Sequence, residues 1–373
     1  MAQAYTPGLK VTARTTHRCR RVLPIAGDVL VQVGETVRAE TIVARTALPG
    51  DITPINMANV LAAPAADVRE CMLKREGEHV EVGEIIARTK GMFGMFKKEH
   101  VSKHSGTIEN ISDTTGQVML RGAPIPVEVA AYMPGRVLEV LPDEGCVIEN
   151  DVTYIQGIFG IGGETSGPIV MAAQSERDRL EANHLTEEMK GCVVVGGARM
   201  TAAAIERAVA VGAAAVVSGG IDDQDLRAFL GYDLGVAITG SENKGITLIV
   251  TEGFGDIAMA VRTFELLQSR AGREASVNGA TQIRAGVMRP EVIIPALEHE
   301  KAVVAEFDAG QLEIDRPVRV IRDPWFGQIG RVASLPTEPA VLGSGSKARV
   351  LAVALDSGEN VVVPRANVEL IEG

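Results

Sequence analysis

The chain has 373 residues, of which 46% are hydrophobic, 23% charged and 3% aromatic, and this composition excludes a disordered or fibrous protein. Its formal net charge of -11 makes the whole molecule repel polyanions, so any contact with nucleic acid needs a local basic patch. The 40 glycines and 17 prolines favour short β elements and tight turns over long helices.

The first segment, residues 1–21, is predicted to be a basic arm. No acidic residue precedes Asp28. Five basic side chains lie in the arm: Lys10, Arg14, Arg18, Arg20 and Arg21. Such a segment is typical of a solvated tail, and a specific partner is the alternative.

The sequence shows neither a signal peptide nor an apolar run of the ~18 residues that a membrane span needs. Its cysteines, Cys19, Cys71, Cys146 and Cys192, lie far apart without a C-x-x-C pair, which is against an iron–sulfur cluster or a zinc knuckle. We therefore expect a cytoplasmic protein without a membrane span, with no metal site and no cofactor.

Two internal repeats organise the next part of the chain. Residues 34–46 match residues 77–89 at the same spacing, and residues 106–118 match residues 135–147. Each repeat is a short apolar strand, a glycine turn and another short strand, which is too small to bury an apolar face alone. We expect the paired copies to close on one another into one compact β domain over residues 22–173.

The segment from Gly77 to Ala87, followed by Ser105 to Ile108, resembles the barrel-sandwich hybrid of biotinyl and lipoyl carrier domains. Similar hybrids occur in the C subunit of Rnf-type electron-transfer complexes and in RNA polymerase. The resemblance implies a fold for about a third of the chain, and it implies no function. The cysteine clusters of the Rnf subunit are absent here.

Residues 90–98 stand where a carrier domain presents its modified lysine, and they read Lys-Gly-Met-Phe-Gly-Met-Phe-Lys-Lys. Because the carrier motif is missing, we do not expect modification of Lys90 or Lys97. The two Met-Phe pairs would be costly to expose. The segment is therefore predicted either to fold back onto the barrel or to meet a partner through Met92, Phe93, Met95 and Phe96.

From residue 190 to residue 300 the pattern changes to apolar runs that alternate with helical periodicity. The runs at 192–195, 214–217 and 246–250 are each apolar throughout, which is typical of parallel strands covered on both faces. We predict a small α/β domain over 190–300. Its joint with the preceding β domain is expected within residues 174–190, where the charge rises.

Glycines that follow these runs are expected at the edge where parallel strands lead into helices, and such an edge favours anions. A phosphate- or carboxylate-bearing ligand is one interpretation, and tight turns needed for packing are the other. The polar stretch at residues 276–286 could likewise hold a ligand or be a solvated connection. The candidate ligand residues are Gly196, Gly197, Gly219, Gly220, Asp222, Glu252, Gly253, Asn278 and Arg284.

The last part, residues 311–373, resembles the KOW motif of NusG-type elongation factors and several ribosomal proteins. The order of a strand, an aromatic turn, Gly-x-x-Gly-x-Val and a closing Asn367-Val368-Glu369 carries this resemblance. It implies an SH3-like β-barrel that contacts RNA or protein. The residues expected to bind RNA or a partner are Arg316, Arg319, Arg322, Trp325, Phe326 and Arg331.

The sequence thus predicts a multi-domain α+β protein made of a barrel-sandwich hybrid, a central α/β parallel-sheet domain and a KOW-like barrel. No catalytic set is evident, so we expect a binding or adaptor protein that engages RNA or a transcription or translation assembly. One alternative is a cofactor- or nucleotide-binding subunit of an electron-transfer enzyme complex, because residues 157–164 resemble the flavin and NADH loop of the Rnf subunit. The other is a self-assembling structural protein, a homo-oligomer.

Overall fold

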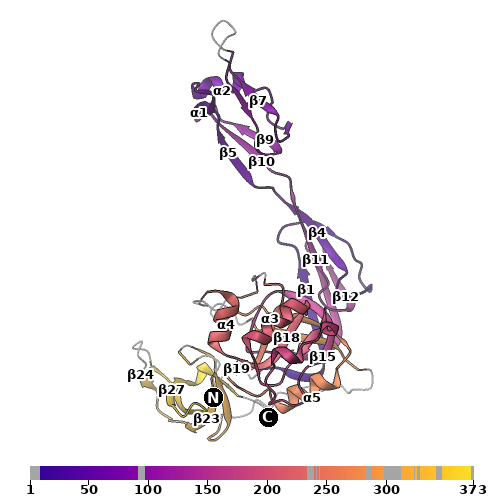
Figure 1. Ribbon diagram of the computed structural model, residues 1–373, viewed down its shortest axis with the longest axis vertical. Coiled ribbons are helices and arrows are strands. Elements are labelled where there is room, and N and C mark those ends of the chain that lie inside the picture. The colour runs from indigo at the N-terminus through magenta and orange to yellow at the C-terminus, as the bar shows by residue number, and fades with distance from the viewer. Residues whose placement is uncertain are drawn as a thin grey trace.

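The computed structural model describes residues 9–90, 97–232, 239–240, 242, 244–282, 288–297, 312–322, 324–325, 328–341 and 347–370. The protein is a mixed α/β molecule with several sheets. A broad body holds the central sheet and the C-terminal module, and a narrow neck carries one small β unit far from the body (Figure 1).

A twelve-stranded sheet runs through the body. Its strands in spatial order are β14 (Phe159–Ile161), β19 (Thr247–Phe254), β18 (Ala215–Ile221), β16 (Val193–Val195), β15 (Glu164–Met171), β20 (Glu274–Asn278), β21 (Glu291–Pro295), β13 (Gly145–Gln156), β12 (Gly135–Leu141) and β3 (Thr36–Val37). Two more strands join from the side: β1 (Val11–Val22) pairs with β13, and β17 (Arg199–Met200) pairs with β18.

The predicted parallel strands are present, and they are covered on both faces. Strands β15, β16, β18 and β19 are parallel neighbours. Helices α3 (Ala202–Val211) and α4 (Asp223–Leu230) pack into one core on one face, and α5 (Val261–Ser269) packs into a second core on the other. Full burial on both sides explains why these strands lack polar alternation.

The expected joint at residues 174–190 is not a domain boundary. The segment forms two short 3-10 turns, Ala182–His184 and Glu187–Met189, and its Leu180, Leu185 and Met189 lie in the same core as α3. Strand β15 pairs in parallel with β16 at one end and antiparallel with β20 at the other. The predicted β and α/β domains therefore share one continuous sheet, since β15 belongs to both halves.

The predicted basic arm is also different in the structure. From Val11 onward it is strand β1, which pairs antiparallel with β13 along its length. Acidic residues on and beside β13 neutralise its outward-facing arginines, through the ion pairs Arg14–Asp151, Arg18–Glu149 and Arg20–Glu144. The positive charge is thus satisfied within the chain, and residues 9–21 are no solvated tail.

The two repeats build two similar β units. The proximal unit uses β3, β12 and β13 together with β2 (Asp28–Val29), β4 (Ile42–Leu48) and β11 (Ile125–Ala130). The distal unit uses β5 (Ile52–Asn56), α1 (Met57–Leu61), α2 (Val68–Cys71), β6 (His79–Val80), β7 (Ile85–Arg88), β8 (Glu99–Val101), β9 (Gly106–Ile111) and β10 (Gln117–Arg121).

Equivalent hydrogen bonds show that the units are copies of one plan. The Gly34 N–H donates to the Val137 carbonyl at 2.8 Å in the proximal unit, and the Gly77 N–H donates to the Ile108 carbonyl at 2.7 Å in the distal unit. Each unit thus combines one copy of the first repeat with one copy of the second. The prediction that paired copies close on one another is wrong, because each unit encloses a core of its own.

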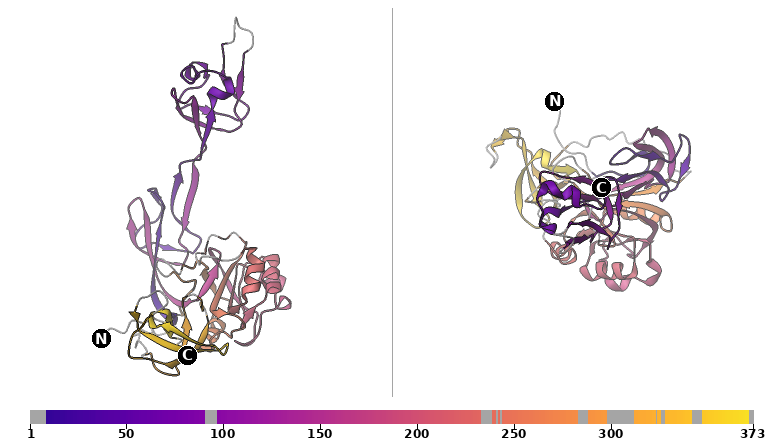
Figure 2. Two further views of the ribbon diagram at one scale, coloured as in Figure 1. Left: turned by 90° about the vertical axis from the view of Figure 1, so that its left-hand side faces the viewer. Right: turned by 90° about the horizontal axis from the view of Figure 1, so that it is seen from above.

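The distal unit is inserted into the hairpin of the proximal unit. Strands β4 and β11 pair as far as Leu48 and Ile125, and β5 and β10 resume the pairing at Ile52 and Arg121. Two further views show the same separation of the distal unit from the body (Figure 2). Only this two-stranded neck connects the two cores within the described chain.

The C-terminal module is a five-stranded antiparallel sheet with its own core. Its strands in spatial order are β27 (Asn360–Pro364), β26 (Val350–Leu355), β23 (Ile329–Ser334), β22 (Pro317–Val320) and β28 (Val368–Leu370). A small hairpin, β24 (Ala340–Val341) and β25 (Lys347–Ala348), extends from it. Among the described residues, no helix combines the length and the apolar character needed to cross a membrane.

Two glycines of the neck test its geometry. A Cβ added at Gly50 would overlap the carbonyl oxygens of Gly122 and Ala123, whereas a Cβ added at Gly122 would meet its nearest atom at 3.5 Å. We expect Gly50→Ala to lower the free energy of unfolding by about 1–3 kcal/mol, as overpacking does elsewhere. Urea titration measures it, with Gly122→Ala as the matched control. Equal losses of unfolding free energy in the two variants would contradict the close backbone approach at Gly50.

Candidate functional site

The glycines at the edge of the parallel strands are packed against backbone. A Cβ at Gly197 would overlap the Ser175 carbonyl oxygen, and one at Gly220 would overlap the Gly255 carbonyl oxygen. Gly196 faces the Ser218 side chain and Gly219 faces the segment 257–259 at 2.5 Å, while Gly253 lies inside β19, opposite Gly220. Close approach of other parts of the chain therefore requires glycine at Gly196, Gly197, Gly219 and Gly220, which agrees with the packing interpretation of these turns.

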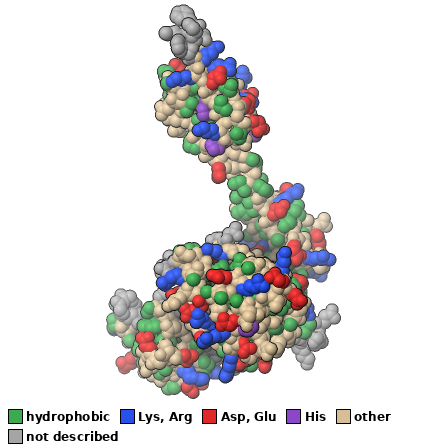
Figure 3. Space-filling view, in the orientation of Figure 1, with side chains coloured by type: hydrophobic (Ala, Val, Ile, Leu, Met, Phe, Trp, Pro, Cys, Tyr) green, Lys and Arg blue, Asp and Glu red, His purple; other side chains and the backbone are tan. Residues whose placement is uncertain are grey.

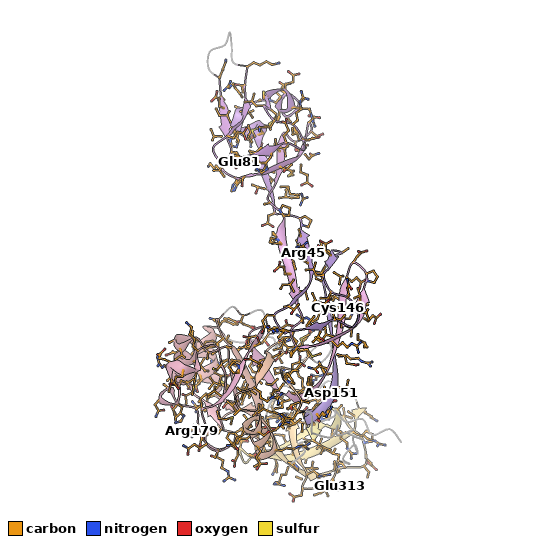
Figure 4. The ribbon with its side chains drawn as sticks, turned by 90° about the vertical axis from the view of Figure 1, so that its right-hand side faces the viewer. Arg45, Glu81, Cys146, Asp151, Arg179 and Glu313 are labelled. Atoms are coloured by element: carbon orange, nitrogen blue, oxygen red, sulfur yellow. The ribbon has the colours of Figure 1, made fainter. Side chains whose placement is uncertain are left out.

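The charged side chains at this edge are paired with one another. Asp222 begins α4 and accepts the Gln224 N–H at 2.9 Å. Arg199 binds Asp225 at 2.5 Å and lies 3.7 Å from Asp222. Arg179, which Figure 4 labels on the surface of the body, pairs with Asp256. Asp222 is thus a helix cap within a network of ion pairs.

Two residues predicted for different sites meet in one buried ion network. Arg319, expected to bind RNA or a partner, is 2% exposed. It donates to Glu252, the expected ligand residue, at 2.8 Å and to Glu369 at 2.8 Å. Arg289 completes the network by donating to Glu369 at 2.6 Å. We call these four residues the interface network, because they join the C-terminal module to the central sheet.

The interface network is short of acceptors. The Nε of Arg319 is buried and has no hydrogen-bond partner among the described residues. Burial lowers the pKa of the Arg289 guanidinium; Glu369 opposes this shift, and the nearby Arg319 and Arg322 add to it. Desolvation of charge costs several kcal/mol per ion unless every partner is in place. The network therefore joins the module to the central sheet at the expense of desolvating its charged groups.

The remaining residues of the predicted basic patch differ in exposure. Trp325 is half-buried and packs against the core of the module. Arg316 and Arg331 are exposed, and Arg331 lies 3.8 Å from Asp315. Arg322 is half-buried. Phe326, Arg284 and the four residues Met92, Phe93, Met95 and Phe96 lie outside the described residues.

A second polar cluster lies where the proximal unit meets the central sheet. The carboxylate of Glu291 accepts the Tyr154 hydroxyl at 2.6 Å and the Tyr132 hydroxyl at 3.3 Å. His17 stacks on Tyr154 with ring centroids 4.9 Å apart. Arg21 lies over the Tyr132 ring, with 5.4 Å between its guanidinium carbon and the centroid. We call these five residues the tyrosine seam.

A row of polar residues extends the tyrosine seam across the sheet. Gln156 is paired with Glu291, Glu291 with Asn278, and Asn278 with Glu164, on the adjacent strands β13, β21, β20 and β15. Arg21 binds Glu164 through two hydrogen bonds of 2.7 Å each. Asn278, a predicted ligand residue, thus lies in this polar row, and its side chain accepts the Ala280 N–H.

Burial in the tyrosine seam favours the uncharged forms of His17 and of the two phenols. Burial raises the pKa of the Cys19 thiol to about 11 and raises the pKa of both phenols, with Glu291 adding to each shift. Burial also lowers the pKa of His17 below 6.5, although Glu291 opposes that shift. A thiol or a phenol that acts as a nucleophile needs a lowered pKa instead. The seam is therefore suited to fixing a joint.

Backbone strain marks the same place. Tyr132 has a φ of 69°, a left-handed conformation that a non-glycine residue adopts at a cost of about 1–3 kcal/mol. The conformation aims its N–H at the Ala39 carbonyl, 2.9 Å away, and its ring into the core of the proximal unit. The tyrosine seam and the proximal core together hold it there.

The sequence analysis missed the tyrosine seam, although alternation along β1 carried a signal. His17, Cys19 and Arg21 are half-buried, while their neighbours Arg18 and Arg20 are exposed. Within the described residues, no group of three or more His, Cys, Asp or Glu side chains could hold a metal ion. No family model and no curated protein matched the chain.

Histidine 17 gives a pH-dependent prediction. Because its pKa is lower in the folded protein, the unfolded chain takes up the proton first, so stability falls as the pH drops below about 6.5. We expect His17→Phe, which keeps the stacking on Tyr154, to lose less stability between about pH 7 and pH 5 than the wild type. Urea titrations at both pH values measure this, with exposed His79→Phe as control. An unchanged pH dependence in His17→Phe would refute the assignment.

The interface network gives a prediction for stability. Glu369 is fully buried and accepts from two arginines. Glu369→Gln removes the negative charge that Arg289 and Arg319 share. We expect it to lower the free energy of unfolding by about 3–5 kcal/mol. The exposed Glu313→Gln in the same module is the control. A loss below about 1 kcal/mol, the size of a surface pair, would contradict a structural role of the network.

Proposed function

We propose that the protein is a non-catalytic adaptor that holds a partner protein on its distal unit and contacts the same assembly through its C-terminal module. One observation carries the proposal: a complete β unit with its own core is held away from the body on a two-stranded neck (Figures 1 and 2). A unit in this position leaves its surface open to another molecule. Such exposure is of little use for catalysis, which needs a sheltered site.

The surface of the distal unit supports a protein contact. Its apolar side chains Val82, Leu73 and Val101 are 65%, 52% and 46% exposed. Basic side chains gather near the far end of the unit (Figure 3). The exposed Lys90, Lys97 and Lys98 flank the segment with the two Met-Phe pairs. Exposed apolar residues on a unit whose far end carries basic side chains suit contact with a protein that carries acidic residues.

The C-terminal module favours protein over RNA. Residues 312–370 contain seven Lys or Arg and seven Asp or Glu, so the module has no net charge to attract phosphates. The burial of Arg319 removes the centre of the predicted basic patch. Its antiparallel strand order with a short 3-10 turn before β28 agrees with an SH3-like KOW domain, which we retain as part of the proposal. The nested β units similarly agree with barrel-sandwich hybrids.

Cross-linking mass spectrometry of the full chain tests the proposal. With a lysine-reactive reagent, we expect Lys90, Lys97, Lys98 or Lys103 to cross-link repeatedly to one partner protein in cells of the source organism. The control replaces residues 49–124 with Asn-Gly, a two-residue turn that closes a β hairpin between β4 and β11. This variant should lose those cross-links and keep the melting temperature of the body.

Two outcomes contradict the adaptor. One is that the lysines of the distal unit cross-link to no protein, while the shortened variant binds the same partners as the full chain. The other is turnover of a small molecule by the purified protein that the Glu369→Gln or Tyr154→Phe substitution abolishes. Ultraviolet cross-links of the full chain to RNA, without lysine cross-links to a protein, would move the proposal to the nucleic-acid alternative.

A further inference from the structure

Strand β27 is an edge of the C-terminal sheet that the chain leaves open. In the spatial order of that sheet it is an end strand, paired with β26 alone, and Figure 1 shows it at the outer side of the body. Val362, at the middle of β27, is 60% exposed, and Asn360 is exposed as well. The central residues of this edge strand are therefore in contact with solvent.

The register of the β26–β27 pair shows which main-chain groups face the open edge. Glu359 and Arg365 each form a main-chain hydrogen bond, of 2.8 and 2.9 Å, with the chain at the two ends of β26. Bonded residues alternate along an antiparallel strand, and this pairing has no bulge. The residues that alternate with the bonded ones, Asn360, Val362 and Pro364, therefore direct their main-chain groups toward the open edge.

Strand β14, an end strand of the central sheet, is closed by side chains instead. The Gly160 N–H donates to the Thr281 hydroxyl at 2.9 Å, and the Gly160 carbonyl accepts from the Thr239 hydroxyl at 2.6 Å. Among the described residues, no side chain bonds to the main chain of Val362 in this way. An open edge made of β-branched residues favours pairing with another strand.

The sequence of β27 is complementary to itself when two copies run antiparallel. A two-fold axis at Val362 places Glu359 of each copy opposite Arg365 of the other, because the two residues lie at equal distances on either side of Val362. Neither side chain has an ion-pair partner among the described residues, and Arg365 donates to the main-chain carbonyls of Pro336 and Val350. Antiparallel pairing thus brings opposite charges together at both ends of the contact.

We propose that two copies of the chain form a dimer in which their β27 strands pair antiparallel about Val362. The two Val362 residues exchange main-chain hydrogen bonds, and their exposed side chains meet on the outer face of a sheet that continues from one module into the other. The Asn360 N–H donates to the Pro364 carbonyl of the second copy, and the ladder ends there because proline has no N–H to return.

The proposed contact is small, since β27 has five residues. Its pairing buries less than the roughly 1,200 Å² of a stable interface, so the dimer dissociates on dilution. The dimer goes beyond the adaptor function and does not depend on it. It places a second distal unit on the same particle, which increases the avidity for any partner that offers more than one binding site.

Sedimentation velocity of the full chain at increasing concentration tests the dimer. We expect the average mass to rise from monomer to dimer and no further, because two-fold pairing is closed. Val362→Lys places like charges at the axis and should weaken dimerisation at least about tenfold. The control is Val341→Lys, at a similarly exposed valine of the β24 hairpin. A wild type that stays monomeric up to about 1 mM, growth beyond the dimer, or equal effects of the two variants would overturn the proposal.

Exchange of the charges tests the register. Glu359→Arg and Arg365→Glu each place like charges opposite one another, so each variant alone should dimerise at least about tenfold more weakly than the wild type. An equimolar mixture has opposite charges at both ends of the contact, and we expect heterodimers, measured by Förster transfer between differently labelled variants. Folded variants that form no heterodimer would overturn the register.

Two controls separate this proposal from folding defects and from the adaptor function. Thermal melting shows whether Arg365→Glu is folded, and Val362→Lys, at an exposed position, decides the proposal if it is not. The variant with Asn-Gly in place of residues 49–124 keeps β27 and should dimerise like the full chain. Its failure to dimerise would overturn pairing through β27, whereas the distal cross-links test the adaptor separately.

Discussion

Strand β13 is the element on which the whole arrangement depends. It is twelve residues long, and its first half pairs with β12 of the proximal unit while its second half pairs with β21 of the central sheet. Strand β1 covers its other edge along nearly the whole length. Strand β13 thus joins the proximal unit to the body by continuous strand pairing, and the tyrosine seam packs at their junction. Without this shared strand the neck would have no rigid base.

The two β units use one plan for different purposes. In the proximal unit the strands β4 and β11 continue outward and carry a second unit, whereas in the distal unit the equivalent strands β7 and β8 lead to the segment 91–96. Residues that face the body in the proximal unit are replaced in the distal unit. At the position equivalent to Tyr132, the distal unit has the exposed Lys103. The two units therefore have similar cores. They differ in their outer residues, which form a buried joint in the proximal unit and an exposed surface in the distal unit.

Local features of the fold were predictable from the sequence. Apolar runs predicted β16, β18 and β19 because strands buried on both faces are mostly apolar and lack polar alternation. The spacing of the repeats predicted short paired strands. It did not predict which copies pair, since both closures satisfy the same apolar pattern, and hydrogen bonds over long separations decide between them.

The candidate sites were harder to predict because their partners are distant in sequence. Arg319 lies between Val318 and Val320, and strand alternation alone would place it on the solvent side. Its burial depends on Glu252 and Glu369, which are 67 and 50 residues away. The tyrosine seam likewise draws on β1, β13 and β21. Charged residues in short apolar strands, such as Glu369 in β28, are the feature that signals such contacts.

The neck has a consequence for how the chain reaches its native topology. The distal unit is contiguous in sequence, so it can fold as soon as residues 52–121 have left the ribosome, before β11 to β13 exist. Its closed ends, joined by the hydrogen bond from the Gly122 N–H to the Asp51 carbonyl at 2.9 Å, then bring β4 and β11 side by side. Residues 49–124 then no longer form a long flexible loop between β4 and β11. The entropic cost of pairing these two strands is lower as a result. If the inserted unit folds first, it acts as an internal template for the unit that carries it.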